Sequence, residues 1–120
     1  MSETSVSSRD RLRKALDHRE PDRIPLDFGG TAVTGVHVSC VAALRHFYGL
    51  SAGPVKVHEP YQMLGLVEDD LRAAIGIDVT GVFPRKTMFG FPAAHWKEWN
   101  FHGLDVLVPA DFLMQFEGNK

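Results

Sequence analysis

The chain has 120 residues, of which 44% are hydrophobic and 23% charged, and its formal net charge is −2. This composition is typical of a globular protein, and no apolar run approaches the roughly 20 residues that cross a bilayer. Because Lys and Arg form no block, we expect neither nucleic acid nor a membrane as a partner. The single cysteine, Cys40, excludes an internal disulfide, and the polar start MSETSVSSRD lacks a signal-peptide core. The sequence therefore predicts a cytoplasmic protein.

The first predicted element is a short helix. We expect residues 1–7 to be a disordered lead and residues 8–120 to form one domain. Ser7 and Asp10 fit the capping box that satisfies the free amides at a helix start. The helix has to end before Pro21, because the residue preceding a proline disfavours helical backbone.

A strand is predicted next, over residues 23–28, with three apolar side chains on one side: Ile24, Leu26 and Phe28. Pro25 lacks an amide hydrogen and indicates an edge strand or an irregular start. The glycine pair that follows breaks the strand. A helix is then expected from about Gly35 to Tyr48, ending at Gly49, and residues 50–57 are expected to be a connector rich in Ser, Gly and Pro.

The second half of the predicted repeat is a longer helix followed at once by a strand. Pro60 suits the first turn of this helix, and Gly76 closes it. Its buried stripe consists of Met63, Val67, Leu71, Ala74 and Ile75. Residues 77–83 are β-branched and partly alternating, so they are expected to form a strand that Pro84 ends. A helix leading directly into a strand favours an α/β architecture.

The last third of the chain is predicted to form a hairpin. Residues 96–101 and 104–108 read as two short strands joined at His102-Gly103, and this hairpin is a candidate flap over a pocket. Four aromatic side chains of this region could form a lid: Phe89, Phe91, Trp96 and Trp99. Aromatic residues on a hairpin nevertheless usually pack under it.

The candidate substrate-binding residues follow the two predicted strands. Asp27 lies at the end of the first strand, where α/β enzymes place functional groups, beside Gly29 and Gly30, which allow close ligand approach, and Thr31. An aspartate before a glycine pair is equally typical of a turn. Arg85 follows the second strand and is a candidate for binding an anionic group, although a surface arginine is more common there.

Other polar residues have simpler interpretations. His37 and Cys40 have a spacing that can present two metal ligands, but two ligands make no zinc site and cysteine is commonly a small buried hydrophobe, so no metal site is predicted. His58-Glu59 fits a polar helix start better than an acid/base pair. The acidic run at residues 68–70 is interpreted as a solvated helix face, and His95 and His102 as solvated histidines.

Four stretches of the sequence can be compared with a known family: RDRLRKAL at residues 9–16, HREPDRIPLDFGG at residues 18–30, residues 66–84, and the WKEW and DVLVP strands of the hairpin. They resemble the N-terminal part of the uroporphyrinogen decarboxylase superfamily, which includes corrinoid-dependent methyltransferases. The resemblance implies an α/β fold, the N-terminal portion of a (β/α)8 TIM barrel, incomplete, with a β-hairpin near the C-terminus. A complete barrel takes roughly 250 residues, so residues 8–120 would be a truncated barrel domain.

Two positions depart from the decarboxylases of this superfamily. Those enzymes carry an arginine-rich segment after the first strand, where this chain has DFGGT, and an aspartate past the next strand, where this chain has Arg85. A tetrapyrrole with several carboxylates needs charge-assisted partners. The resemblance therefore favours methyl transfer from a corrinoid protein as the reaction of the complete enzyme, with uroporphyrinogen decarboxylation in porphyrin and heme biosynthesis as the alternative.

The resemblance also implies cofactors and partners. The methyltransferases use a zinc thiolate site from a later part of the barrel, so we expect no cofactor in this chain, and zinc, a corrinoid protein and a small-molecule substrate for the complete enzyme. A hypothesis from another class is a non-catalytic remnant or interaction module that needs a complementary chain. Open barrel edges predict self-association and an inactive isolated chain.

Overall fold

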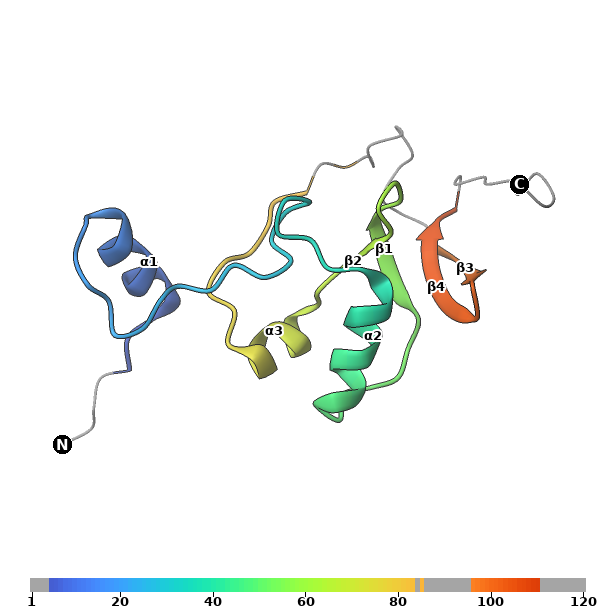
Figure 1. Cartoon of the computed structure of the whole chain (residues 1–120), viewed down its shortest axis with the longest axis horizontal. Coiled ribbons are helices and arrows are strands. Elements are labelled where there is room, and N and C mark those ends of the chain that lie inside the picture. Colours follow the sequence, from blue (N-terminus) through green and yellow to red (C-terminus); the bar gives the residue numbers. More distant parts are fainter. Residues whose placement is uncertain (1–4, 84, 86–95, 111–120) are drawn as a thin grey trace.

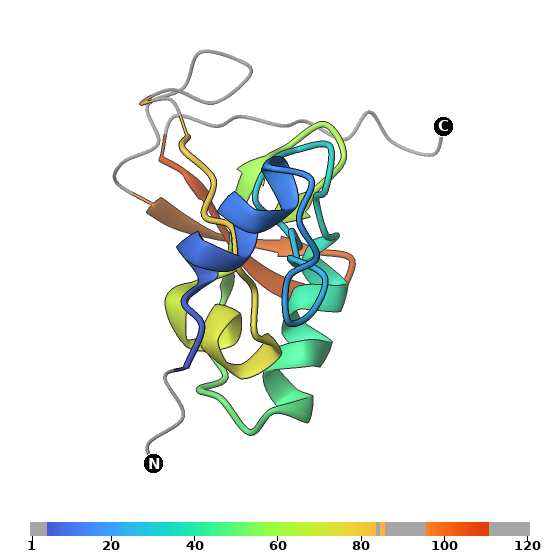
Figure 2. The same ribbon diagram turned by 90° about the vertical axis from the view of Figure 1, so that its left-hand side faces the viewer.

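The computed structural model describes residues 5–83, 85 and 96–110. Within this part of the chain the elements are, in order, α1 (Ser8–Leu16), α2 (Val38–Phe47), β1 (Val55–Glu59), β2 (Leu64–Gly65), α3 (Asp69–Ile75), β3 (Trp96–Phe101) and β4 (Leu104–Pro109). α1 lies at one end of the elongated molecule and the β3–β4 hairpin toward the other (Figure 1). Figure 2, seen from the α1 end, shows α1 in front of the strands. None of the described helices has the length and apolar character needed to cross a membrane.

The prediction that the chain forms the N-terminal portion of a (β/α)8 barrel is wrong. The described strands form one open, mixed sheet with the order β2-β1-β4-β3. The outer pairs are antiparallel, and only the central pair, β1 with β4, is parallel, with Val55 opposite Val106. Residues 23–28 and 77–83, which were expected to be the parallel barrel strands, contain no strand.

Residues 23–28 and 77–83 nevertheless run side by side as extended chain (Figure 1). The Asp78 amide donates to the Leu26 carbonyl at 2.9 Å, whereas the Leu26 amide donates to the Asp78 carboxylate, also at 2.9 Å, instead of to a backbone carbonyl. Pro25 contributes no amide hydrogen. The Asp78 side chain thus replaces one of the backbone-to-backbone hydrogen bonds that a sheet needs. This explains why the two apolar stretches approach each other without forming a sheet.

The first two predicted helices are present. Ser7 caps α1, accepting a hydrogen bond from the Asp10 amide at 3.1 Å, which confirms the serine cap of the predicted helix start, and α1 ends before Pro21. α2 begins at Val38, three residues later than predicted, because His37 is its cap and the His37 ring accepts from the Ser39 amide at 3.2 Å.

The prediction of a long helix from Pro60 is wrong. The buried Glu59 carboxylate accepts from the amides of Tyr61 and Gln62, at 2.9 and 2.7 Å, and this closes a turn where the helix was expected. β2 follows, and α3 then occupies only Asp69–Ile75. Gly76 ends α3 at a φ of 85°, as predicted. β1 also lies partly within residues 50–57, where only a connector was expected.

The predicted hairpin is confirmed. β3 and β4 pair antiparallel from Trp96 opposite Pro109 to Phe101 opposite Leu104. His102 and Gly103 both have positive φ, 49° and 87°, which suits a two-residue hairpin turn. The hairpin is not a free flap, since β4 is an interior strand of the sheet.

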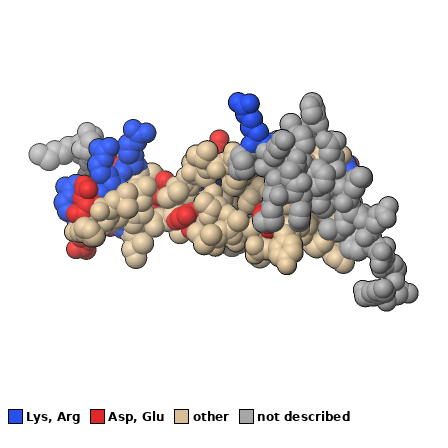
Figure 3. Space-filling view, turned by 90° about the horizontal axis from the view of Figure 1, so that it is seen from above, with Lys and Arg blue, Asp and Glu red and all other residues tan. Residues whose placement is uncertain are grey.

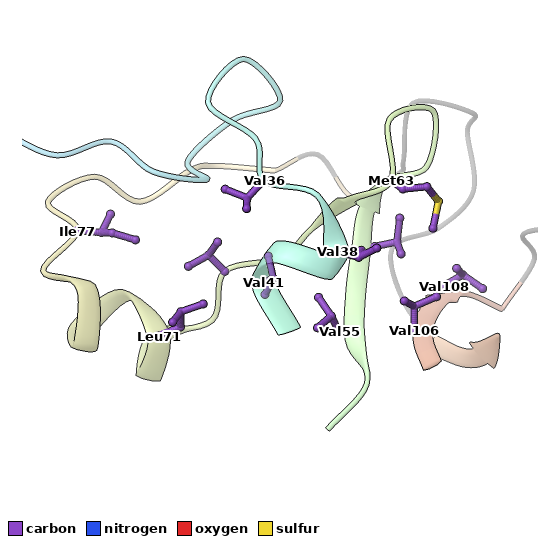
Figure 4. Packing of buried hydrophobic residues seen from close by; sticks show 11 residues of the cluster. Val36, Val38, Val41, Val55, Met63, Leu71, Ile77, Val106 and Val108 are labelled. Carbon is purple, nitrogen blue, oxygen red and sulfur yellow. The ribbon is translucent and has the colours of Figure 1, made fainter. Parts of the chain in front are cut away.

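The core lies where α2 packs against β1 and β2, and side chains of α3 and β4 join the same cluster (Figure 4). It is built almost wholly from aliphatic side chains: Val36, Val38, Val41, Val55, Val57, Met63, Val67, Leu71, Ile77, Val106 and Val108. Leu71, Val57 and Val106 have no exposed surface. Burial of these side chains supplies the main stabilisation of this half of the molecule.

Candidate functional site

The buried carboxylate of Asp78 joins three segments that are far apart in the sequence. It accepts hydrogen bonds from Ser8 Oγ at 2.8 Å, Arg11 Nη1 at 2.6 Å, Arg23 Nη1 at 3.0 Å and the Leu26 amide at 2.9 Å. Its side chain has no exposed surface. Burial alone would raise the pKa of Asp78, but the bonds from Leu26, Ser8 and Arg11 outweigh it and lower the pKa to about 2. Asp78 is therefore charged at neutral pH and fixes α1 against residues 23–28.

Arg11 extends this cluster to a second carboxylate. Its Nε and Nη2 donate to Asp22 at 2.8 and 2.9 Å, in the two-pronged geometry that guanidinium and carboxylate groups favour. The hydrogen bond from Arg11 lowers the pKa of Asp22, and the bonds to Asp22 and then to Asp78 raise the pKa of Arg11. Lys and Arg side chains gather at this end of the molecule (Figure 3).

A cavity of about 520 Å³ opens beside the ends of the two extended segments. It is lined by residues 28–30 from the first segment, 66–70 and Arg72 from α3 and the chain before it, and 79–81 and Phe83 from the second segment. Two stretches that the sequence separates by about fifty residues thus share one candidate ligand site.

Two glycines permit the close backbone approach that shapes the cavity. A Cβ atom on Gly81 would lie 1.6 Å from the carbonyl oxygen of Gly30. Gly29 has a φ of 79°, and a Cβ atom there would lie 2.6 Å from Val67 Cγ2. Side chains at these positions would therefore clash with the cavity wall.

The predicted site residues occupy different places. Gly29 and Gly30 line the cavity, whereas Asp27, Thr31 and Arg85 do not. Asp27 Oδ1 accepts from the Gly30 amide at 3.2 Å and from Thr34 Oγ1 at 3.1 Å, the bonds of a turn aspartate. Thr31 is exposed and its hydroxyl oxygen accepts from the Val33 amide, and Arg85 is exposed on the chain beyond the cavity.

The acidic residues at the start of α3 face part of the cavity, and most of their charge is neutralised by neighbours. Asp70 receives two bonds of 2.8 Å from the buried Arg45, which lower the pKa of Asp70. Glu68 lies 3.6 Å from Lys56 Nζ. Two residues of the run that was interpreted as a solvated helix face therefore have tertiary partners.

The cation that lines the cavity, Arg72, is also engaged. Its Nη1 donates to Asp69 Oδ1 at 2.8 Å, and its Nη2 donates to Thr80 Oγ1. Among the described lining residues Arg72 is the sole cationic side chain, against the three carboxylates of residues 68–70. The cavity combines apolar walls with a rim of paired charges.

One functional candidate that sequence reasoning missed is His58. Its Nε2 atom is buried and has no hydrogen-bond partner among the residues that the structure describes, and its ring lies against Phe83, with 4.9 Å between the ring centroids. Burial lowers the pKa of His58, and the Glu59 charge offsets this only in part. The alternation of VKVHE at residues 55–59 was the available signal that this histidine belongs to a strand.

The remaining candidates are not assembled into a site. His37 and Cys40 are exposed, and no three His, Cys, Asp or Glu side chains within the described ranges are placed to hold a metal ion. Trp99 packs against Phe101 in the sheet, with centroids 5.6 Å apart, and Lys56 Nζ lies over the Trp96 ring at 5.6 Å. Neither tryptophan lines the cavity; Phe89, Phe91 and His95 lie outside the described residues.

Comparisons of the chain with protein-family models, with curated proteins and with solved structures found no match. Inferences about function therefore depend on the residues around the cavity and on the sequence motifs that form it.

Proposed function

We propose that this chain is the ligand-binding N-terminal part of a cytoplasmic enzyme related to the uroporphyrinogen decarboxylase superfamily, and that the complete enzyme transfers a methyl group from a corrinoid protein. Zinc and the methyl acceptor would be bound by other parts of the complete enzyme. The chain itself would supply one wall of the substrate site.

The observation that carries this proposal is the convergence of the two motifs. HREPDRIPLDFGG and the stretch at residues 66–84 are the longest parts of the family resemblance, and both contribute to the same cavity. Gly30 and Gly81, at the ends of these motifs, are in backbone contact. Glycines that allow such an approach beside an open cavity are typical of a ligand site.

The charges of the cavity favour methyl transfer over porphyrinogen decarboxylation. A substrate with several carboxylates needs several cations, and burying such charges without partners is costly. The described lining offers Arg72, already bonded to Asp69 and Thr80, and three acidic side chains. A neutral or cationic substrate fits this environment better than a polycarboxylate.

The experiment is to read the coding sequence beyond Lys120, express the entire product and assay both reactions. Methyl transfer is followed by the loss of methylcobalamin absorbance with a thiol acceptor, and decarboxylation by porphyrin products from uroporphyrinogen III. We expect methyl transfer, together with His and Cys ligands for zinc in the added sequence. Decarboxylation, or a reading frame that closes at Lys120 with neither activity, would contradict the proposal.

A second candidate role, association with a complementary chain or with another copy, is favoured by exposed aliphatic side chains. Ile24, Val33 and Val82 are 86%, 95% and 97% exposed. Aliphatic side chains so open to water favour association. Sedimentation velocity on the chain and on the Ile24→Lys/Val82→Lys variant tests this role; concentration-dependent association that the variant loses is expected, and a monomer at all concentrations would exclude it.

A further inference from the structure

The His58 side chain is half-buried, and its Nε2 atom is fully buried without a hydrogen-bond partner among the described residues. Buried polar atoms in folded proteins almost always have a hydrogen-bond partner, and exceptions point to a function or to a group that is absent. The Nε2 atom of His58 has none within the described part of the chain, although the residue lies on the interior strand β1. Its neighbours in the strand, Val57 and Glu59, are both buried.

Phe83 contacts both the His58 ring and the cavity. The Phe83 ring stacks at a tilt of 46° on the imidazole and also forms part of the cavity wall. Phe83 is itself 41% exposed, and Val82 beside it is 97% exposed. No backbone hydrogen bond joins residues 79–83 to another described residue. The ring that packs on His58 is therefore half-exposed, and it lies at the end of a segment that has no backbone hydrogen bonds to other described residues.

We propose that Phe83 is a movable cover and that Nε2 of His58 hydrogen-bonds a ligand in the cavity, one that combines an apolar body with a single polar group. Movement of the Phe83 ring would open the imidazole to the cavity without disturbing β1. Phe28 and Val67 would contact the apolar body of the ligand. This inference rests on the cavity being the ligand site of the proposed function.

The chemistry of the imidazole suits this role. Because burial lowers the pKa of His58, the ring is neutral at pH 7 and offers one donor and one acceptor nitrogen. A neutral histidine binds a hydroxyl group without demanding a counter-charge. This matches a cavity whose rim carboxylates are already paired and whose one described cationic side chain, Arg72, is already bonded.

The cover is tested by the rate at which diethyl pyrocarbonate modifies His58, followed by peptide mass spectrometry on the full chain. Exposed His46 is the internal reference. We expect slow modification of His58 in the unaltered protein and a several-fold faster rate in Phe83→Ala, with no change in Phe47→Ala, which removes a 78% exposed ring elsewhere. A His58 rate equal to that of His46, or one unaffected by Phe83→Ala, would overturn the proposed cover.

The hydrogen bond is tested with phenol and toluene as matched probes, because they differ in one hydroxyl group. Binding is measured by chemical-shift changes of the cavity residues in NMR spectra. We expect phenol to bind about two- to tenfold more tightly than toluene, the range of one net hydrogen bond. His58→Phe should abolish this preference, His58→Gln should retain part of it, and His46→Phe should leave it unchanged. A preference that survives in His58→Phe would refute the role of Nε2.

The two tests also separate this inference from the proposed function. Toluene binding with no phenol preference would retain the cavity as a ligand site and reject His58. Failure of both probes to perturb the cavity residues would reject His58 and count against the ligand site as well. Neither result depends on which reaction the complete enzyme catalyses.

Discussion

The α1 end and the sheet end of the molecule are held together by different contacts. At the α1 end, Ser8, Arg11 and Arg23 converge on the buried carboxylate of Asp78. At the sheet end, α2 packs against β1 and β2, and aliphatic side chains of α3 and β4 join the same cluster (Figure 4). The first set of contacts depends on protonation state and the second on volume, so acid and core truncation should affect the two ends differently. The cavity lies between them.

The largest expected effect is truncation at the sheet end. Leu71→Ala removes a side chain with no exposed surface and should destabilise the protein by about 2–5 kcal/mol, through lost burial and the cavity left behind. The control is Leu16→Ala on α1, where the side chain is 72% exposed and the change should stay within about 0.5 kcal/mol. Urea unfolding followed by circular dichroism measures both; equal effects would contradict the contrast between the two ends.

The junction between the two ends is tested by Gly81→Ala. The added methyl group would collide with the Gly30 carbonyl oxygen, and the clash should cost about 1–3 kcal/mol. Gly53→Ala is the matched control, because no atom lies within 4 Å of a Cβ there and the substitution should be neutral or stabilising. If thermal melting shows Gly81→Ala to be as stable as Gly53→Ala, the backbone contact is not formed in solution.

Lowering the pH should weaken the contacts that hold the α1 end before it affects the packing at the sheet end. The pKa of Asp78 is about 2 in the folded protein and 3.8 as an ordinary value, so its stabilising contribution is complete above about pH 4 and is lost as the pH falls through about 2. Asp78→Asn should remove this pH dependence and raise hydrogen exchange in α1, while Asp17→Asn, which alters an exposed carboxylate, should leave it. Protection factors of the α1 amides that stay constant between pH 4 and pH 2 would be inconsistent with the buried carboxylate.

The smallest effects are expected at Asp27 and Arg85. Asp27→Ala removes a turn hydrogen bond to Gly30 and should cost about 0.5–1.5 kcal/mol without changing phenol binding. Arg85→Ala should change stability by less than about 0.5 kcal/mol, since the residue is exposed. A loss of phenol binding in Asp27→Ala, measured by NMR titration, would return Asp27 to the ligand site.

Elements whose determining partners are close in the sequence could be predicted. The capping pair of α1 spans three residues, and the β3–β4 turn is set by His102 and Gly103. The alternation of VKVHE was a local signal for β1, but its parallel pairing with β4 could not be predicted, because β4 lies about fifty residues further along the chain. The helix predicted from Pro60 fails because the Glu59 carboxylate captures two of the amides that would have started it.

In the candidate site, too, residues with a local sequence signal could be predicted and residues with distant partners could not. Gly29 and Gly30 could be identified from the glycine pair after an apolar stretch. Asp78 could not, because its partners Ser8, Arg11 and Leu26 are 70, 67 and 52 residues away. An aspartate inside an apolar run, which needs a buried partner, was the available signal.

The most direct test of the account is whether the two extended segments meet in solution. Nuclear Overhauser spectra of the isotopically labelled chain should show cross-peaks from the Asp78 amide proton to Leu26 and from the Gly81 α-protons to Gly30 and its neighbours. These cross-peaks would establish the junction that forms the cavity. Resolved signals for all four residues with no cross-peak between the segments would contradict it.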